Sequence, residues 1–356
     1  MTKTLKKIVI TSGGTGGHIF PAYSLAKYFE KQGTKVQLTS DLRGLKYLKN
    51  YPDIETVTID SFRVNIKNII KILFSIIKSL SFLISFKPNL VFGMGGYSSF
   101  PVCFAAAILR IPFIIYENNL QIGKANNFLL KFTNKVLVAN EELEGVSQKN
   151  KKKLSRVGNI IRKEIIEFGE QNQKTDKNKN LRILVLGGSQ AAKIFAQVLP
   201  QIFKRCVDSK IPIQVFQQCL PDQNEYLENF YKHLDIDFEI FNFTDNILSF
   251  FSKSNLVITR SGSSMLAELI NAKKPFISIP LPSSADNHQL KNAIYYEKNK
   301  YSFLIEEKNL GKELFPLLEK INNDMSLLDQ IKTKQSQYSD KLVFRNIDKE
   351  LEFYLK

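Results

Sequence analysis

The chain has 356 residues, 44% of them hydrophobic, and this length favours two domains with separate cores over one ordinary domain. The chain has 50 Lys and Arg against 34 Asp and Glu, a formal net charge of +16. This excess favours an anionic partner, unless it reflects only a compositional drift toward lysine. No zinc-finger, RRM or helix-turn-helix pattern accompanies the charge, so nucleic acid is disfavoured as the partner. Three widely separated cysteines without metal-ligand spacing disfavour a zinc site or a disulfide framework and are typical of reduced thiols in a cytosolic protein.

The first half of the chain alternates predicted strands and helices. Residues 4–11 form a predicted strand, and residues 18–32 a helix with Pro21 in its first turn and Gly33 at its end. Because the first residues lead directly into a strand, no signal peptide is predicted. Further strands are predicted at 35–39, 90–92, 112–116 and 135–139.

A polar run at 171–180 lacks any hydrophobic periodicity. It is expected to be either the interdomain connection or a loop just after it. A second strand–helix series follows from 181 to about 340, and 341–356 forms a predicted terminal helix. The further strands of this series are predicted at 213–216, 238–241, 256–259 and 276–280.

Four glycine-rich turns each follow a predicted strand and precede a predicted helix. They lie at 13–17, 93–96, 187–188 and 260–264. Glycines let a bulky anionic substrate approach the backbone, and the start of the following helix favours a phosphate. His18, at the rim of the first turn, exchanges a proton near neutral pH. Two turns in each half predict two doubly wound domains, although each turn alone is also compatible with a simple tight crossing.

Residues 66–86 form a strongly apolar stretch that Lys67, Lys71 and Lys78 interrupt. Each lysine near a helix centre costs about 2.5–3.5 kcal/mol on insertion, so a membrane-spanning helix is disfavoured. Two interpretations remain open. The stretch is either a helix packed on the sheet, or a helix that also offers an apolar, lysine-edged face, extended by Phe62 and Arg63, to an anionic bilayer.

Seven short motifs span nearly the whole chain. They are GGTGGHIFPA at 13–22, GMGGYSS at 93–99, YENN at 116–119, GNIIR at 158–162, GGSQAA at 187–192, RSGSSMLAEL at 260–269 and ADNHQLKNA at 285–293. In sequence and in order, these motifs resemble those of one known family, the MurG family of UDP-N-acetylglucosamine–N-acetylmuramyl-(pentapeptide) pyrophosphoryl-undecaprenol N-acetylglucosamine transferases.

The resemblance implies a GT-B glycosyltransferase fold, an α/β architecture of two Rossmann-like, doubly wound domains facing across a cleft. It implies an N-terminal acceptor- and membrane-binding domain at 1–160 and a C-terminal domain binding UDP-N-acetylglucosamine (UDP-GlcNAc) at 161–340. Residues 341–356 would pack back on the N-terminal domain as a terminal helix. The expected location is peripheral, on the cytoplasmic face of the bacterial inner membrane.

The implied reaction is the inverting transfer of GlcNAc from UDP-GlcNAc to the C4 hydroxyl of the muramyl unit of undecaprenyl-diphospho-MurNAc-pentapeptide (lipid I). The product is lipid II, used in peptidoglycan synthesis. No cofactor and no metal are implied. Asp235-Ile236-Asp237 has the form of an Asp-x-Asp metal motif, but no family motif surrounds it, and we interpret it as solvent-facing charge.

In the N-terminal half, the resemblance and the needs of the reaction single out His18 and its neighbours. His18 is the candidate base for the acceptor hydroxyl, and the alternative is a hydrogen bond to sugar or phosphate. Asn119 resembles an asparagine near the donor sugar. Thr15, Gly16 and Gly17 match positions that meet the donor.

In the C-terminal half, the candidates surround the departing UDP. Arg162 matches a family arginine at the nucleotide, and Glu268 is assigned to the ribose hydroxyls, with a helix-dipole charge as the alternative. Gln289 and the neighbouring His288 resemble a glutamine pair that holds GlcNAc, and Thr244 falls where the family presents backbone to uracil. The remaining candidates are Ser189, Ser263, Ser264, Met265, Leu266 and Ala267.

Three positions depart from the family pattern. Tyr116 stands where many members have histidine, so an acid–base role for that histidine is absent. Ala191 replaces a glycine, and His288 replaces a glutamine. None of these changes removes a group that the chemistry requires.

Other function classes remain open from the sequence. UDP-GlcNAc 2-epimerases share the two-domain fold and the donor, a GT-B glycolipid synthase would use a different lipid acceptor, and a nucleotide-binding membrane protein would show no turnover.

Overall fold

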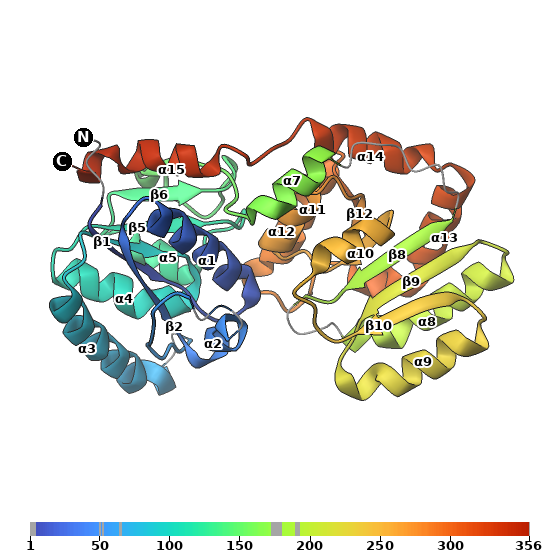
Figure 1. Ribbon diagram of the computed structural model, residues 1–356, viewed down its shortest axis with the longest axis horizontal. Coiled ribbons are helices and arrows are strands. Elements are labelled where there is room, and N and C mark those ends of the chain that lie inside the picture. The colour runs from blue at the N-terminus through green and yellow to red at the C-terminus, as the bar shows by residue number, and fades with distance from the viewer. Residues whose placement is uncertain are drawn as a thin grey trace. The chain divides into compact units, whose positions relative to one another are not determined.

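The computed structural model describes residues 5–49, 51, 53–63, 66–171, 180–188 and 193–355 (Figure 1). The chain divides into two compact units. Unit 1 comprises Met1–Arg162 and Asp340–Lys356, and unit 2 comprises Lys163–Ser339.

Unit 1 is built on a seven-stranded parallel sheet in the order β3-β2-β1-β4-β5-β6-β7 (Figure 1). Ile8 and Ile10 of β1 face one core cluster, whereas Val9 faces the opposite one. Both faces of the sheet are therefore covered, as parallel sheets require. The strands are β1 (Lys7–Thr11), β2 (Lys35–Ser40), β3 (Thr56–Thr58), β4 (Leu90–Gly93), β5 (Phe113–Glu117), β6 (Lys135–Val138) and β7 (Leu154–Arg156).

The helices of unit 1 cover these two faces. They are α1 (Gly16–Lys31), α2 (Leu42–Leu48), α3 (Ile69–Phe86), α4 (Gly96–Ile108), α5 (Lys124–Leu129), α6 (Gln148–Lys151) and α15 (Val343–Leu351), with 3-10 turns at Ile66–Asn68 and Glu352–Leu355. Val343, Ile347 and Leu351 of α15 belong to the same core cluster as α1. The C-terminal helix is thus an integral part of the first unit's core.

Unit 2 contains a six-stranded parallel sheet in the order β10-β9-β8-β11-β12-β13. Its core cluster joins buried β8, β9 and β11 side chains to α8 and α13. The strands are β8 (Leu181–Leu186), β9 (Ile213–Gln218), β10 (Asp237–Phe241), β11 (Leu256–Thr259), β12 (Phe276–Ser278) and β13 (Phe303–Leu304). The helices are α7 (Lys163–Gln171), α8 (Lys193–Asp208), α9 (Asn224–His233), α10 (Ile247–Lys253), α11 (Ser263–Asn271), α12 (His288–Lys298), α13 (Leu310–Asn323) and α14 (Ser326–Ser336), with 3-10 turns at Pro221–Gln223, Ala285–Asn287 and Glu307–Asn309.

The predicted strands are confirmed to within a few residues, but the predicted start of the first helix is wrong. Helix α1 begins at Gly16 instead of residue 18, so Pro21 lies beyond its first turn. Of the two alternatives for the polar run at 171–180, the connection between the units is excluded, because the chain passes from unit 1 to unit 2 at Arg162–Lys163. That passage follows the buried, apolar Ile160 and Ile161, which polarity alone could not mark as a boundary. The described ends of the polar run are Gln171, which ends α7, and Asn180, just before β8.

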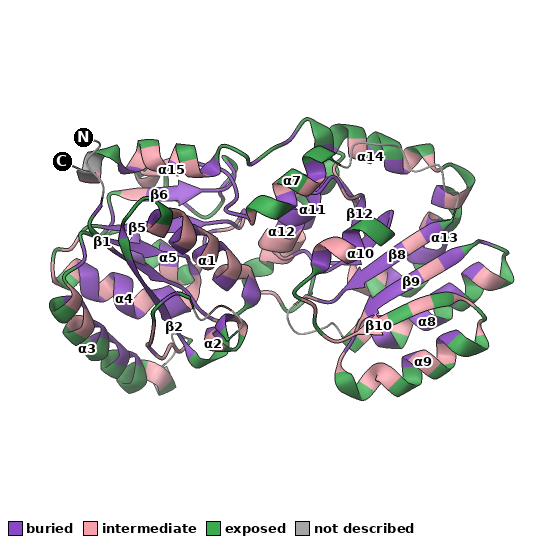
Figure 2. Cartoon of the chain, in the orientation of Figure 1, coloured by how far each residue is buried: buried purple, intermediate pink, exposed green. Residues whose placement is uncertain are grey.

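Helix α3 buries only one stripe of its surface, which packs toward α4 (Figure 2). The buried residues are Ile72, Ser75, Ile76, Ser79 and Leu83, at helical spacing. Among the described residues, α3 is the one helix long and apolar enough to cross a membrane by length and composition.

The outward face of α3 is also apolar. Ile70, Phe74 and Ile77 are 69%, 68% and 60% exposed. Phe128 at the end of α5 and Phe132 just beyond it are also exposed, and α4 packs against both α3 and α5. We call these five residues the apolar patch. Large exposed apolar patches ordinarily mark a protein or membrane contact.

Candidate active site

Each sheet reverses its strand order beside its first strand. In unit 1, β2 and β4 flank β1, and in unit 2, β9 and β11 flank β8 (Figure 1). In open parallel sheets, ligands bind at the carboxyl ends of the strands at such a reversal. The four predicted glycine-rich turns follow β1, β4, β8 and β11, so they lie at these two positions.

The turn after β1 leaves no room for side chains. A Cβ at Gly13 would lie 2.8 Å from the Ser98 Cβ and 2.9 Å from an Asp41 carboxylate oxygen. Gly14 has a φ of +81°, which disfavours any other residue. Ser12, directly before this turn, carries a fully buried hydroxyl without a hydrogen-bond partner, and so does Ser261 before α11 in unit 2.

His18 lies in the first turn of α1, against the turn after β4. A side chain at Gly95 or Gly96 would meet the imidazole at 3.9 and 3.6 Å. Both glycines have positive φ angles of 88° and 72°, which keep other residue types out. The structure therefore brings two predicted glycine turns and the half-buried His18 together at one strand reversal. Beside them, Thr15 is exposed, Gly16 is buried and Gly17 is half-buried.

A buried carboxylate that the sequence analysis did not single out orients Asn119. Glu117, at the end of β5, accepts hydrogen bonds from the Asn119 backbone N–H at 3.1 Å and from its side-chain amide at 3.0 Å. It also accepts from Gly123 N–H at 3.2 Å and from the Asn126 amide at 2.8 Å. The motif YENN contained this residue, but only the fold shows that its side chain turns inward.

Tyr116 serves as a scaffold where many family members carry histidine. Its hydroxyl donates to the Gly158 carbonyl at 3.2 Å and accepts from the Ile160 N–H at 3.0 Å. Burial raises the pKa of this phenol well above its ordinary value, so it stays neutral. Arg162, the last residue of unit 1, lies over the Phe20 ring of α1, with 5.7 Å between the guanidinium carbon and the ring centroid.

In unit 2, the turn after β11 leads into α11. Gly262 precedes the helix in extended conformation, and Ser263, Ser264 and Met265 are half-buried at its start. The side chains of Leu266 and Ala267 are fully buried. Any ligand contact at these two positions would therefore come from the backbone. Gly188 has a φ of +78°, and the predicted Ser189 and Ala191 lie outside the described residues.

Glu268 lies beyond the first turn of α11, which contains no acidic residue. Its side chain is buried, at 8% exposure. The helix dipole acts within the first turn, so a dipole charge explains this buried carboxylate poorly.

Gln289 joins two loops at this edge of the sheet. Its side-chain oxygen accepts from the Ser261 N–H at 3.2 Å and from the Leu281 N–H at 3.0 Å. These two donors fix the orientation of the amide and leave its NH2 group to donate elsewhere.

The neighbouring His288 lies with its Nδ1 2.7 Å from the Ala285 carbonyl oxygen. Thr244 caps the following turn, accepting from the Asn246 N–H at 3.0 Å.

Arg260 is a second residue without a role in the sequence analysis. Its guanidinium donates to the Ile279 and Pro280 carbonyls at 3.2 and 3.3 Å and pairs with Glu307. It also lies over the Phe195 ring at 5.0 Å. Arg260 thus ties the loop after β11 to the loop after β12.

Asp235 and Asp237 are both exposed, as predicted. Within the described parts of the chain, no group of three or more His, Cys, Asp or Glu side chains is placed to hold a metal ion.

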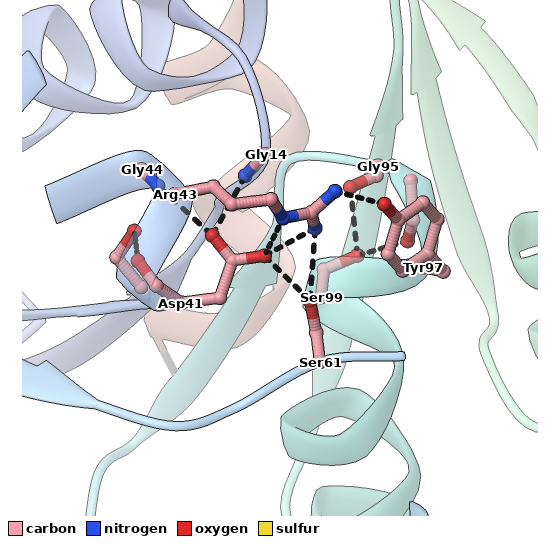
Figure 3. A network of polar contacts seen from close by, with 10 residues as sticks. Gly14, Asp41, Arg43, Gly44, Ser61, Gly95, Tyr97 and Ser99 are labelled. Carbon is pink, nitrogen blue, oxygen red and sulfur yellow. Dashed lines mark hydrogen bonds and ion pairs between the residues drawn. The ribbon is translucent and has the colours of Figure 1, made fainter. Parts of the chain in front are cut away.

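A polar network links the turn after β1 to the turn after β4 (Figure 3). One oxygen of Asp41 accepts from the Gly14 and Gly44 N–H groups, both at 2.9 Å. The other accepts from the Ser61 hydroxyl at 2.6 Å and from the Arg43 guanidinium. Although burial acts to raise it, the hydrogen bonds from Ser61, Gly14, Arg43 and Gly44 hold the pKa of Asp41 below its usual value.

Asp41→Asn is therefore expected to destabilise the chain by about 1–3 kcal/mol at pH 7, because charge-assisted hydrogen bonds are lost. A lowered folded-state pKa gives stability that is present above the unfolded pKa of about 4 and is lost as the pH falls below it. Denaturant unfolding measures the free energy of unfolding of Asp41→Asn and of the native chain at pH 7 and pH 3. The variant should be clearly less stable than the native chain at pH 7, and this loss of stability should be smaller at pH 3. An equal loss at both pH values would contradict this explanation. The control Asp53→Asn, whose carboxylate is 47% exposed, should cost less than about 1 kcal/mol.

Comparison with known families agrees with this architecture. Residues 8–138 match the glycosyltransferase family 28 N-terminal domain, and residues 182–350 match the family 28 C-terminal domain. A relative from Rickettsia canadensis (strain McKiel) is 34% identical over 333 residues, which are 91% of this chain and 93% of the relative. A relative from Pelagibacter ubique (strain HTCC1062) is 32% identical over 342 residues, 94% of each chain. Both are named UDP-N-acetylglucosamine–N-acetylmuramyl-(pentapeptide) pyrophosphoryl-undecaprenol N-acetylglucosamine transferase.

The chain belongs to the MurG family of glycosyltransferases. The predicted GT-B class with two Rossmann-like domains is confirmed for this MurG-family chain.

Solved structures share the fold. The crystal structure of Acinetobacter baumannii MurG superposes with a TM-score of 0.78 at 24% identity, covering 98% of this chain and 99% of that one. A UDP-GlcNAc 2-epimerase from Neisseria meningitidis bound to UDP-GlcNAc superposes with a TM-score of 0.70 at 15% identity, covering 97% and 99%. At these identities the likeness concerns the fold alone.

Proposed function

We propose that this enzyme carries out the reaction for which its relatives are named. It transfers GlcNAc from UDP-GlcNAc to the C4 hydroxyl of the muramyl unit of lipid I, giving lipid II. Identity of 32–34% over more than 90% of the chain to these transferases supports the assignment. The epimerase alternative has no comparable support, because the epimerase shares only the fold.

The arrangement that carries the proposal is His18 at the strand reversal of unit 1. The half-buried imidazole lies against a turn whose two glycines leave the backbone uncovered. In the proposed step, the acceptor oxygen forms a bond to the anomeric carbon of GlcNAc while the bond to the diphosphate breaks. The hydroxyl proton passes to His18, and UDP leaves with inversion at the sugar carbon.

Most of the proposed donor contacts belong to unit 2. The Gly187–Gly188 turn and the start of α11 would stabilise the charge of the departing diphosphate. Glu268 would accept from the ribose hydroxyls, and the fixed amide of Gln289 would donate to the sugar. Thr15, Gly16, Gly17, Asn119, Arg162, Thr244 and His288 are proposed as further donor contacts.

The reaction is tested by release of UDP from UDP-GlcNAc with and without a lipid-linked muramyl acceptor. The proposal expects release that depends on acceptor. UDP-ManNAc formed from UDP-GlcNAc alone would instead indicate an epimerase, and UDP binding without release would indicate a binding protein. Release supported by diacylglycerol but not by the muramyl acceptor would indicate another glycolipid synthase.

The apolar patch supports a peripheral position on an anionic membrane, through residues 62–86. The segment contains no acidic residue. Lys67, Lys71 and Lys78 are exposed, and Lys71 lies 5.4 Å from the Phe62 ring centroid. Exposed apolar side chains with flanking lysines are typical of a face that enters a bilayer interface. Because UDP-sugars and reduced thiols belong to the cytoplasm, we place this contact at the cytoplasmic face of the inner membrane.

Replacing Ile70, Phe74 and Ile77 together with serine should lower binding to phosphatidylglycerol-containing vesicles by about tenfold or more, because each buried apolar side chain contributes about 1.5–3 kcal/mol. Reversing Lys71 and Lys78 to glutamate should weaken binding by about tenfold at low salt and less at high salt. Vesicle co-sedimentation measures both effects. Leu342→Ser, which removes an apolar side chain of similar exposure (56%) outside the patch, is the control. Unaltered binding by all variants would leave α3 as a purely structural helix.

A further inference from the structure

We infer that Arg43 binds the diphosphate linker of the lipid acceptor and that Asp41 is the positioning residue that holds it there. This inference rests on the proposed function and adds a residue that determines acceptor specificity. It starts from the polar network at the strand reversal of unit 1 (Figure 3).

Arg43 lies directly over the turn after β1. A Cβ at Gly14 would be 3.7 Å from a terminal nitrogen of the guanidinium. The Arg43 side chain is 47% exposed, whereas the Asp41 side chain that anchors it is only 4% exposed. The guanidinium is therefore anchored by a buried carboxylate, while part of its own surface remains accessible to a ligand.

Tyr97 also holds the guanidinium. The guanidinium carbon lies 4.8 Å from the Tyr97 ring centroid, and Nη1 donates to the Tyr97 hydroxyl. It also donates to the Ser61 hydroxyl at 3.3 Å. Because Asp41 is itself bonded to the Gly14 N–H, the cation and the turn keep a constant relative position. Asp41 and Ser61 engage the Nε and Nη2 groups, so the second N–H of Nη1 is the donor left for a phosphate oxygen, and it is held in a fixed position on a cation that stays charged.

The surroundings favour a diphosphate with a lipid on one side and a sugar on the other. Ser61 belongs to the segment that leads into α3, which carries part of the apolar patch. Tyr97 follows Gly96, where an added Cβ would lie 3.6 Å from the His18 imidazole. Arg43 therefore lies between the segment before α3, through Ser61, and the turn beside His18, through Tyr97. In the acceptor, the diphosphate likewise lies between the lipid and the muramyl hydroxyl.

The starts of two long helices add to the anionic preference. Helix α1 has 16 residues and α4 has 13, and the paired Asp41 and Arg43 bond to the starts of both, Asp41 to Gly14 before α1 and Arg43 to Tyr97 in the first turn of α4. Their N–H groups and dipoles favour negative charge at the same place. Two negatively charged phosphates would outweigh the single carboxylate that Arg43 already faces.

The test compares two soluble short-chain acceptors that share the muramyl sugar, one with a diphosphate linker and one with an uncharged linker. Arg43→Gln should raise the KM for the diphosphate acceptor by about tenfold, since a charge-assisted contact is lost. Its KM for UDP-GlcNAc and its kcat/KM for the uncharged acceptor should stay within about twofold. Arg43→Lys should recover part of the loss.

The matched control is Arg156→Gln, which removes an arginine of similar exposure (49%), paired with Glu141, at the opposite edge of the same sheet. Arg156→Gln should leave the KM for both substrates and the kcat/KM for both acceptors unchanged. Asp41→Asn should raise the diphosphate acceptor KM in the same direction. The double variant with Arg43→Gln should be no worse than Arg43→Gln alone, because the two residues act as one unit.

Binding of farnesyl diphosphate, measured by calorimetry, tests the inference independently of turnover. The native enzyme should bind it, and Arg43→Gln should bind about tenfold more weakly. Equal losses on both acceptors, or farnesyl diphosphate binding that Arg43→Gln leaves unchanged, would show that Arg43 is only a structural brace. Normal farnesyl diphosphate binding that Arg43→Gln weakens, without transfer to either acceptor, would overturn the proposed reaction instead.

Discussion

His18→Ala is expected to lower kcat by about 10²- to 10⁴-fold while UDP affinity changes by less than about twofold, because general-base catalysis contributes on that scale. The physical reason is location. His18 lies at the strand reversal of unit 1, against the glycine turn after β4, whereas the proposed nucleotide contacts belong mainly to unit 2. Steady-state kinetics with both substrates, together with calorimetric UDP binding, separates the two effects.

The other two histidines of the chain provide controls. His233 is exposed on α9, with Nδ1 2.6 Å from the Asn229 carbonyl, and His233→Ala should leave kcat unchanged. His288→Ala should change the donor KM more than kcat, because it is proposed to contact the sugar. If His18→Ala weakened UDP binding as much as it lowered turnover, His18 would be a nucleotide contact and the base would have to be sought elsewhere.

Glu268→Ala is expected to weaken UDP binding by about tenfold or more, because hydrogen bonds to a charged carboxylate contribute about 1.5–3 kcal/mol. Glu268→Gln should show an intermediate loss, since an amide accepts through only one oxygen. Isothermal calorimetry with UDP and with 2′-deoxy-UDP gives the direct readout. The native enzyme should prefer UDP, and the alanine variant should lose this preference.

A helix-dipole role for Glu268 makes a different prediction. Glu313 lies in the first turn of α13 and is exposed, so Glu313→Ala should alter stability by about 0.3–1 kcal/mol without any effect on UDP. If Glu268→Ala behaved in the same way as Glu313→Ala, the ribose assignment would be wrong.

The parallel sheets were predictable because their strands are short apolar runs that alternate with helices. The glycine turns were predictable for a local reason, since only glycine serves where φ is positive, as at Gly14 and Gly95. The start of α1 was misplaced because glycines 16 and 17 have low helix propensity, and the fold nevertheless makes them helical.

Other features depend on contacts distant in sequence. Asp41 precedes α2 and bonds the Gly44 N–H, a local capping pattern that the sequence could have revealed. Its bond to Gly14, 27 residues upstream, exists only because β1 and β2 are neighbours. Likewise, the sequence of 66–86 allows two interpretations, because its apolar residues occupy more than one face of a helix. In the structure one stripe of α3 is buried and the other is exposed.

The central claim is that this enzyme joins GlcNAc to a lipid-linked muramyl acceptor with inversion. The most direct test incubates it with UDP-GlcNAc and a short-chain lipid I analogue and analyses the purified product by mass spectrometry and proton NMR. The account predicts a disaccharide one GlcNAc heavier than the acceptor, with a β-1,4 linkage and one UDP released per product. A product with an α linkage, or an unmodified acceptor after complete conversion of the UDP-GlcNAc, would contradict it.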